Sequence, residues 1–76
     1  MQKQMIQYDS PIDALVAVAK RLSAYEERFS MSSEEFYDIY TKGGHEDTID
    51  FVEWSNDYQH YMNIRRDLEK HLQNAA

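Results

Sequence analysis

The chain has 76 residues, of which 42% are hydrophobic, 29% charged and 13% aromatic, and its formal net charge is −6. This length allows one small domain whose apolar core is only marginally sufficient, so we expect large aromatic rings to supply much of the buried area. The absence of cysteine excludes disulfides, thiolate metal sites and a cysteine nucleophile. The longest apolar run, residues 14–19, is too short to span a bilayer, and we expect a cytoplasmic protein.

The negative charge is concentrated in the middle of the chain. Residues 26–57 contain ten acidic residues and two basic ones, Arg28 and Lys42, a local balance of −8, whereas each flank is +1. Proteins that bind phosphate use clustered Lys and Arg, so this distribution argues against direct contact with nucleic acid or with an anionic membrane surface. The partner that it favours is a basic protein.

The first predicted helix covers residues 11–29 and follows a segment, residues 1–9, that we expect to be flexible. Ser10 is suited to cap it, Pro11 to occupy its first position, and Asp13 to lie in its first turn. Apolar residues then recur at spacings of three and four, as in a helix that buries one face: Leu15, Val18, Leu22, Tyr25 and Phe29.

A second, short helix is predicted over about residues 33–42. Ser32 lies three residues before Glu35, which is the spacing of a capping box. The helix should end at the sequence TKGG, where either Gly43 or Gly44 can take the left-handed conformation that closes a helix.

The third predicted helix covers about residues 48–73 and leaves residues 74–76 as a tail. Either Asp47 or Thr48 can cap it. One face repeats at spacings of three and four: Phe51, Trp54, Tyr58, Tyr61, Arg65, Leu68 and Leu72. Arg65 is the one polar residue on this face, so we expect its guanidinium either to reach Asp13 of the first helix or to extend to solvent while its stem packs.

These elements predict an all-α fold. Two long helices with heptad-like apolar faces should pack as an antiparallel hairpin, with the short helix as the elbow between them. The third helix is roughly 39 Å long and the first roughly 28 Å, so part of the apolar face of the third helix stays uncovered. We therefore expect the chain to form a homodimer in a helical bundle.

A metal site is one chemical alternative. Glu53, Asp57 and His60 lie at positions i, i+4 and i+7 of the third helix, and carboxylates with imidazole can bind a transition metal. Against this, the apolar face places all three on the outward side, and the Asp-x-x-His spacing of helical-bundle metal sites occurs only once. The GGHEDTID turn also lacks the pattern of a calcium loop, and nothing in the sequence implies a cofactor.

We favour the interpretation that the protein is not an enzyme and has a surface that binds another protein. Tyrosines on the elbow cannot all point inward with Phe36, and exposed aromatic rings beside acids are typical of protein interfaces. The candidate residues for binding a partner are Glu34, Glu35, Tyr37, Asp38, Asp50, Glu53 and Asp57. Alternatively, the chain is a DNA-mimic decoy. Its carboxylates would then occupy the DNA-binding site of another protein, at the positions that phosphates otherwise take.

The segment from RLSAYEERF through MSSEEFYDIY to DFVEW resembles a group of small bacterial all-helical proteins. Their pattern is Y-E-x-x-[FY]-x-M-S-S-E-x-F-Y, then a glycine-bearing turn, then D-[FM]-x-E-W, and the resemblance covers about residues 22–68. Some members look like antitoxin-type partners of small toxins, which implies that the acidic and aromatic residues cover a basic toxin. The chain departs from the pattern at GGHED, where the group more often has G-x-x-G-D-D, and the resemblance implies no catalytic residue.

Overall fold

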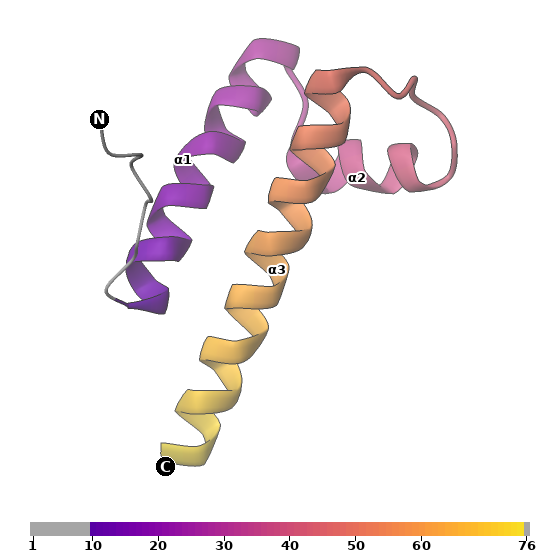
Figure 1. Cartoon of the computed structure of the whole chain (residues 1–76). Coiled ribbons are helices and arrows are strands. Elements are labelled where there is room, and N and C mark those ends of the chain that lie inside the picture. The colour runs from indigo at the N-terminus through magenta and orange to yellow at the C-terminus, as the bar shows by residue number, and fades with distance from the viewer. Residues whose placement is uncertain (1–9, 76) are drawn as a thin grey trace, which may run out of the picture.

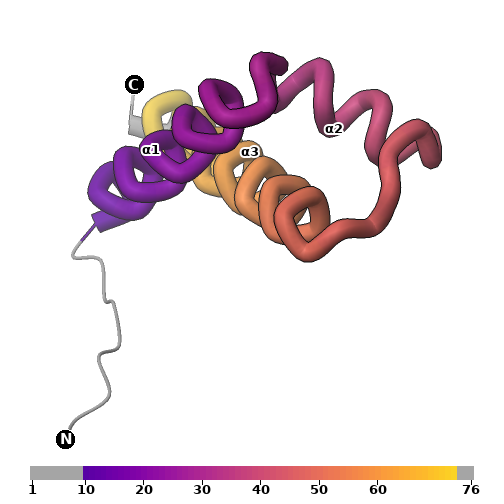
Figure 2. Tube along the Cα trace, turned by 90° about the horizontal axis from the view of Figure 1, so that it is seen from above, coloured from indigo at the N-terminus to yellow at the C-terminus, as the bar shows by residue number. Residues whose placement is uncertain are grey.

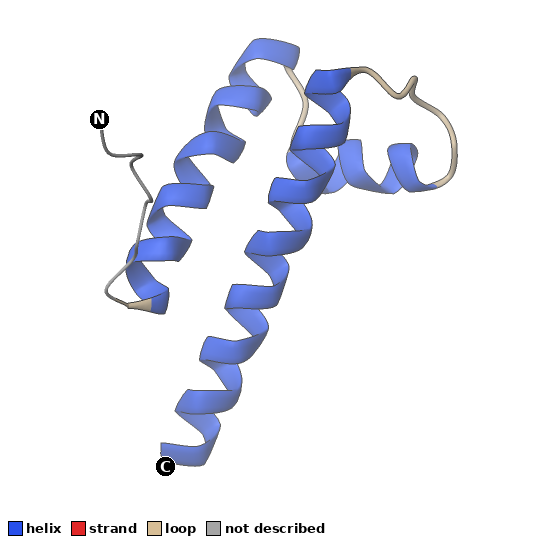
Figure 3. Cartoon of the chain, in the orientation of Figure 1, coloured by secondary structure: helices blue, strands red, loops and turns tan. Residues whose placement is uncertain are grey.

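The computed structural model describes residues 10–75, with side chains for residues 10–73. They form three helices, α1 (Pro11–Phe29), α2 (Ser33–Thr41) and α3 (Ile49–Ala75) (Figure 1). The described residues contain no strand (Figure 3), which confirms the predicted all-α class. The segment predicted to be flexible, residues 1–9, lies outside the described residues, as does residue 76.

α1 and α3 pack side by side in opposite directions, as predicted for the hairpin (Figure 1). We call the end where α1 ends and α3 begins the closed end, and the other the open end. α2 projects from the closed end and contacts both long helices (Figure 2). No described helix is long and apolar enough to cross a membrane.

α1 has the bounds that its local sequence predicts. The Ser10 hydroxyl accepts a hydrogen bond of 3.2 Å from the Asp13 amide, and Pro11 occupies the first turn. The helix ends where Ser30 takes a left-handed conformation, with φ of 55°, and donates its amide to the Glu26 carbonyl. This conformation turns the chain at once into α2.

The start of α2 is capped from two sides. The Ser32 hydroxyl accepts a hydrogen bond of 3.1 Å from the Glu35 amide, as the capping-box spacing predicts. The Glu26 carboxylate of α1 accepts a second one, 2.8 Å long, from the Ser33 amide. A side chain of α1 therefore satisfies one of the free amides at the start of α2 and fixes the angle between the two helices.

Both glycines after α2 have a structural role. α2 ends at Thr41, one residue before the predicted end, and Gly43 takes the left-handed conformation, with φ of 82°. At Gly44 a Cβ atom would lie 2.5 Å from Cγ2 of Ile39, so a larger residue does not fit there without a shift. The chain thus turns tightly back toward α3.

α3 begins one residue later and ends two residues later than predicted. Thr48 is the cap, since its hydroxyl accepts a hydrogen bond of 3.1 Å from the Phe51 amide. Asp47, the other candidate, instead accepts a hydrogen bond of 2.7 Å from the Tyr40 hydroxyl. The helix extends to Ala75, so residues 74 and 75 are helical and not a tail.

Stacked aromatic rings form the core at the closed end. Trp54 and Phe36 are fully buried, with ring centroids 3.9 Å apart and planes that differ by 2°. Tyr25 and Phe29 of α1 stack on Trp54 at 5.4 and 5.5 Å. The indole N–H of Trp54 donates a hydrogen bond of 2.9 Å to the Ser33 hydroxyl, so its polar atom is satisfied inside the core.

Toward the open end the packing departs from the predicted face of α3. Ile64 is buried, although the periodic pattern did not include it, whereas Leu72 is 72% exposed. The reason is geometric: the face that α3 turns to α1 shifts along the helix, and α1 begins at Pro11, which leaves the end of α3 uncovered. The main core cluster, Leu22, Phe36 and Trp54, therefore lies in the half of the hairpin next to α2, and Val18 and Ile64 are buried farther toward the open end.

Candidate protein-binding surface

The acids of α3 lie against α1. Asp57 forms an ion pair of 3.2 Å with Arg21, and Asp50 forms one of 2.9 Å with Arg28. Arg28 follows Arg21 by seven residues and Asp50 precedes Asp57 by seven, so the two pairs fit a single antiparallel register. These two members of the predicted binding set thus help to align the hairpin.

The third acid on α3, Glu53, lies between those two pairs and close to Tyr25. The pKa of Tyr25 is raised above its ordinary value of 10.0, first by burial and then by the negative charges of Asp57, Glu53 and Asp50. All three acids are therefore close enough to one half-buried ring, that of Tyr25, to act on its hydroxyl. Asp57 differs from the sequence expectation, because its side chain is only 19% exposed and does not face outward.

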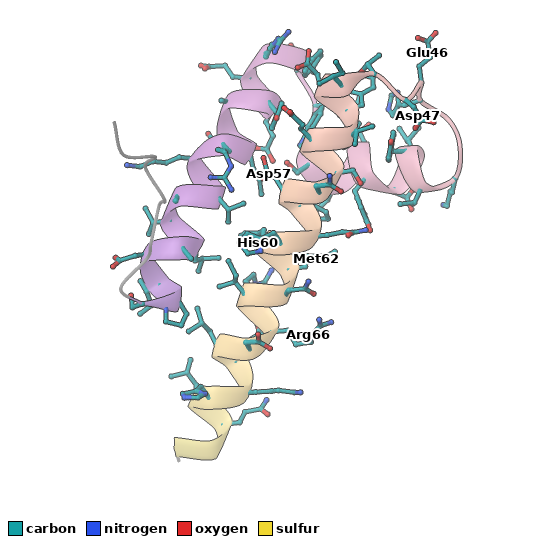
Figure 4. The ribbon with its side chains drawn as sticks, in the orientation of Figure 1. Glu46, Asp47, Asp57, His60, Met62 and Arg66 are labelled. Carbon is teal, nitrogen blue, oxygen red and sulfur yellow. The ribbon has the colours of Figure 1, made fainter. Side chains whose placement is uncertain are left out.

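The alternative metal site, Glu53, Asp57 and His60, is not formed among the described residues. Figure 4 shows Asp57 and His60 close together along α3. Among the described residues, however, no group of three or more His, Asp or Glu side chains could hold a metal ion. The physical reason is that Asp57 turns to Arg21, while the His60 side chain stays exposed.

Arg65 does not reach Asp13. Its guanidinium pairs with Glu69, one turn along α3, at 3.3 Å and lies 5.9 Å from the centre of the Tyr61 ring. These two neighbours raise its pKa above the ordinary value. The side chain is mostly exposed, so of the two sequence alternatives the one in which the charged group extends to solvent is correct.

The acids of α2 have different surroundings. Glu34 and Glu35 lie in its first turn and are exposed. Among the described side chains, neither carboxylate has a hydrogen-bond or ion-pair partner. Asp38 is also exposed and pairs with Lys42, one turn along the helix, at 3.2 Å. The predicted binding set therefore has two adjacent carboxylates without an ion pair at the start of α2, and Glu53 of α3, near Tyr25, is exposed and also forms no ion pair among the described side chains.

Tyr37 joins α2 to α3 and is half-buried. Its hydroxyl accepts a hydrogen bond of 2.8 Å from Gln59, and its ring lies 5.0 Å from that of Tyr58. Tyr40, on the same helix, stacks on Phe36 at 5.3 Å. Both elbow tyrosines therefore pack within the molecule while keeping one edge accessible.

A cavity of about 170 Å³ opens beside the first turn of α2, where all three helices meet. It combines two carboxylates, two tyrosine rings, one guanidinium and small or apolar side chains. The residues that line it are Ala19, Leu22, Glu26, Ser33, Glu34, Tyr58, Tyr61 and Arg65. The pKa of Tyr58 is raised by burial and then by the negative charge of Glu34, so its hydroxyl keeps its proton.

Only one residue of this cavity, Glu34, belongs to the binding set predicted from sequence. Tyr58 and Tyr61 have the spacing of core residues, which is why the periodic pattern assigns them to packing. Glu26 lies one turn after Leu22 and carries no local signal of a site. Its place in the cavity depends on how α2 folds back over α1 through the hydrogen bond from Ser33.

Comparison with models of protein families, with curated proteins and with solved structures found no match.

Proposed function

We propose that this chain is a non-enzymatic, antitoxin-like interaction protein that binds a basic protein partner through the exposed face of α2. The observation that carries this proposal is the contrast between two groups of acids. Asp50 and Asp57 are paired with arginines of α1, whereas Glu34 and Glu35 are exposed and lack such partners among the described side chains.

The binding residues in this proposal are Glu34, Glu35, Tyr37 and Asp38. Their carboxylates attract a positively charged protein over a distance and speed its encounter, while the accessible edge of Tyr37 adds contact area once the complex forms. Asp50 and Asp57 act indirectly, by pairing with Arg28 and Arg21 and so holding α3 in register with α1. Some members of the group that the sequence resembles look like antitoxin-type proteins, which suggests a small basic toxin as the partner.

The DNA-mimic alternative receives less support from the same contacts. A mimic needs a long row of free carboxylates in place of phosphates, and two acids of α3 are neutralised by Arg21 and Arg28. Glu34 and Glu35, the unpaired acids of the proposed binding face, are neighbours in the first turn of α2. So short a group suits contact with a few basic side chains better than contact with a duplex-binding groove.

Affinity purification tests the proposal. The tagged chain is incubated with an extract of its native cells, and the proteins retained at moderate salt are identified and quantified by mass spectrometry. Three baits are compared: the wild type, Glu34→Lys/Glu35→Lys and Glu27→Lys/Asp67→Lys. The last pair is exposed, has no ion-pair partner among the described side chains, and changes the net charge equally.

We expect one small basic protein at near-equal amount with the wild type and with the Glu27/Asp67 variant, and its loss with the Glu34/Glu35 variant. Equal retention by all three baits, or a wild-type chain that retains nothing, would contradict the proposal. Circular dichroism of each bait checks that the helices are intact.

We also infer that the chain forms a homodimer through the open end of the hairpin. Ile12 is 60% exposed and Leu72 is 72% exposed there, while Leu15 and Leu68 are half-buried. The described core contains five buried hydrophobic residues, Val18, Leu22, Phe36, Trp54 and Ile64. Chains of this size commonly complete so small a core by oligomerising, and a second copy supplies the same apolar surface in return.

A further inference from the structure

We propose that the cavity between the three helices receives a single arginine or lysine side chain of the partner. This inference rests on the proposed function and gives it a specific anchoring point. It places the recognition of positive charge at Glu26 and Glu34 together with Tyr58 and Tyr61, rather than across all exposed acids.

The walls of the cavity match the two parts of a long basic side chain. Leu22 and Ala19 of α1 provide an apolar surface for the aliphatic stem. The ring of Tyr58 on α3 offers a face that attracts a cation through its electron density. The neighbouring Tyr61 ring already has the Arg65 guanidinium 5.9 Å from its centre. Glu34, on the first turn of α2, supplies a carboxylate for the charged end.

Glu26 adds a second carboxylate that is already held in position. One of its oxygens, Oε2, accepts the Ser33 amide at 2.8 Å. A carboxylate has about four lone-pair sites, so Glu26 can accept further hydrogen bonds without losing this one. Because Glu26 and Glu34 come from different helices, they converge only in the folded chain, and the Glu26 carboxylate is already ordered before the cation enters.

The volume of the cavity limits what can enter. At about 170 Å³ it is smaller than the ~300–1,000 Å³ typical of pockets for drug-sized ligands. One amino-acid side chain is a better match than a cofactor or a nucleotide.

The charges of the lining residues favour a cation over an anion. Glu26 and Glu34 contribute −2 and Arg65 contributes +1, so the lining is −1 before anything binds. Arg65 is itself held by Glu69 outside the cavity at 3.3 Å. A phosphate or carboxylate ligand would meet the two glutamates at close range, whereas one added guanidinium or ammonium group makes the lining neutral.

An NMR titration of the full chain tests the inference. The probe is N-acetyl-arginine methylamide, which carries one positive charge, and the control probe is the neutral citrulline analogue of the same shape. We expect saturable shifts of the amide signals of Ser33, Glu34, Tyr58 and Tyr61 with the arginine probe, with a dissociation constant in the millimolar range, and no saturable shifts with the citrulline probe.

Two matched variants locate the charge that matters. Glu34→Gln removes a carboxylate that lines the cavity, whereas Glu35→Gln removes the carboxylate of the next residue, which does not line it. Both side chains are exposed in the first turn of α2, so the two changes affect helix stability similarly. We expect Glu34→Gln to weaken binding of the arginine probe by about tenfold or more, and Glu35→Gln by less than about twofold.

The outcomes separate this inference from the proposed function. If Glu34→Gln and Glu35→Gln weaken binding of the arginine probe equally, or if the shifted signals spread over all exposed acids, the cavity is not the site that binds the probe. The acidic face of α2 can still bind a partner in that case. If no saturable shifts occur but retention of the partner in the affinity purification still depends on Glu34 and Glu35, the cavity inference is wrong and the proposed function stands. If retention of the partner does not depend on Glu34 and Glu35, the proposed function is wrong whatever the titration shows.

Discussion

Ser33 connects all three helices through two hydrogen bonds. Its amide, in α2, donates to the Glu26 carboxylate of α1, and its hydroxyl accepts from the indole N–H of Trp54 in α3. Ser33 and Trp54 are both buried. Removing the hydroxyl therefore leaves a buried indole N–H without an acceptor.

We predict that Ser33→Ala lowers the free energy of unfolding by about 1–3 kcal/mol, which is the usual cost of leaving a buried polar group unsatisfied. Urea denaturation followed by Trp54 fluorescence measures this, since the sequence has one tryptophan. Ser23→Ala is the control, because Ser23 is exposed on α1 and its replacement should change stability by less than about 0.5 kcal/mol. Equal stability of Ser33→Ala and the wild type would contradict the role given to Ser33.

Tyr25 should make the stability sensitive to alkaline pH. Its pKa is raised in the folded chain, by burial first and by the acids of α3 second, above the 10.0 expected for the unfolded chain. Below pH 10 the hydroxyl is protonated in both states and has no effect on the pH dependence. Above pH 10 the unfolded chain loses the proton more readily, so the free energy of unfolding falls as the pH rises.

We predict that Tyr25→Phe makes the decline in the free energy of unfolding above pH 10 less steep than in the wild type. The measurement is a series of urea denaturation curves from pH 8 to pH 11, with the slope against pH compared between the two proteins. Identical slopes would show that Tyr25 titrates alike in both states.

At the scale of elements, the ion pairs between α1 and α3 select one alignment of the hairpin. A shift by one residue would separate Arg28 from Asp50 and Arg21 from Asp57 at the same time. The arginines are largely exposed, so each pair contributes little energy and acts mainly on register. Stacking of Tyr25 and Phe29 on Trp54 supplies the larger share of the attraction.

We predict a favourable coupling of about 0.2–1 kcal/mol between Arg28 and Asp50 in a double-mutant cycle. The cycle combines Arg28→Ala with Asp50→Asn and uses the free energies of unfolding of the four proteins. It cancels the separate losses of the Arg28 contact with Phe29, at 5.0 Å, and of a negative charge at the start of α3. Additive losses at low salt would mean that the pair does not stabilise the fold.

At the scale of the whole molecule, the two ends of the hairpin differ in their packing. The closed end holds the stacked rings and α2, with Ile49 of α3 exposed beside them, whereas the open end exposes aliphatic side chains of both α1 and α3. The proposed partner surface and the proposed dimer contact therefore lie on different parts of the molecule, so both can be occupied together.

We predict that Leu72→Glu dissociates the proposed dimer, because a charge then replaces an apolar side chain in both copies of the contact. Burial of one leucine is worth about 1.5–3 kcal/mol, so the dissociation constant should rise by more than about tenfold. Sedimentation equilibrium measures it. Ile49→Glu is the matched control, since Ile49 is 77% exposed at the closed end. A monomeric wild type, or equal effects of the two substitutions, would contradict a dimer through the open end.

The sequence by itself determined the three helices and most of their ends. Ser10 and Ser32 cap helices through hydrogen bonds to residues three positions away, as their spacing predicts. The sequence left open whether Asp47 or Thr48 caps α3 and whether Gly43 or Gly44 closes α2, and the structure shows Thr48 and Gly43 in these roles. Such interactions are short in sequence and depend on residue type, so they can be predicted without knowing the fold. The aromatic face of α3 around Trp54 was predictable for the same reason.

Only the tertiary structure decided which acids are paired and which remain available. The partners of Asp50 and Asp57 lie 22 and 36 residues away along the chain, and the periodic pattern of one helix contains no information about them. The burial of Ile64, the pairing of Arg65 with Glu69 and the convergence of Glu26 with Glu34 likewise depend on how far one helix turns and slides against another. That alignment is set by many weak contacts acting together, and it is what places a cavity beside α2.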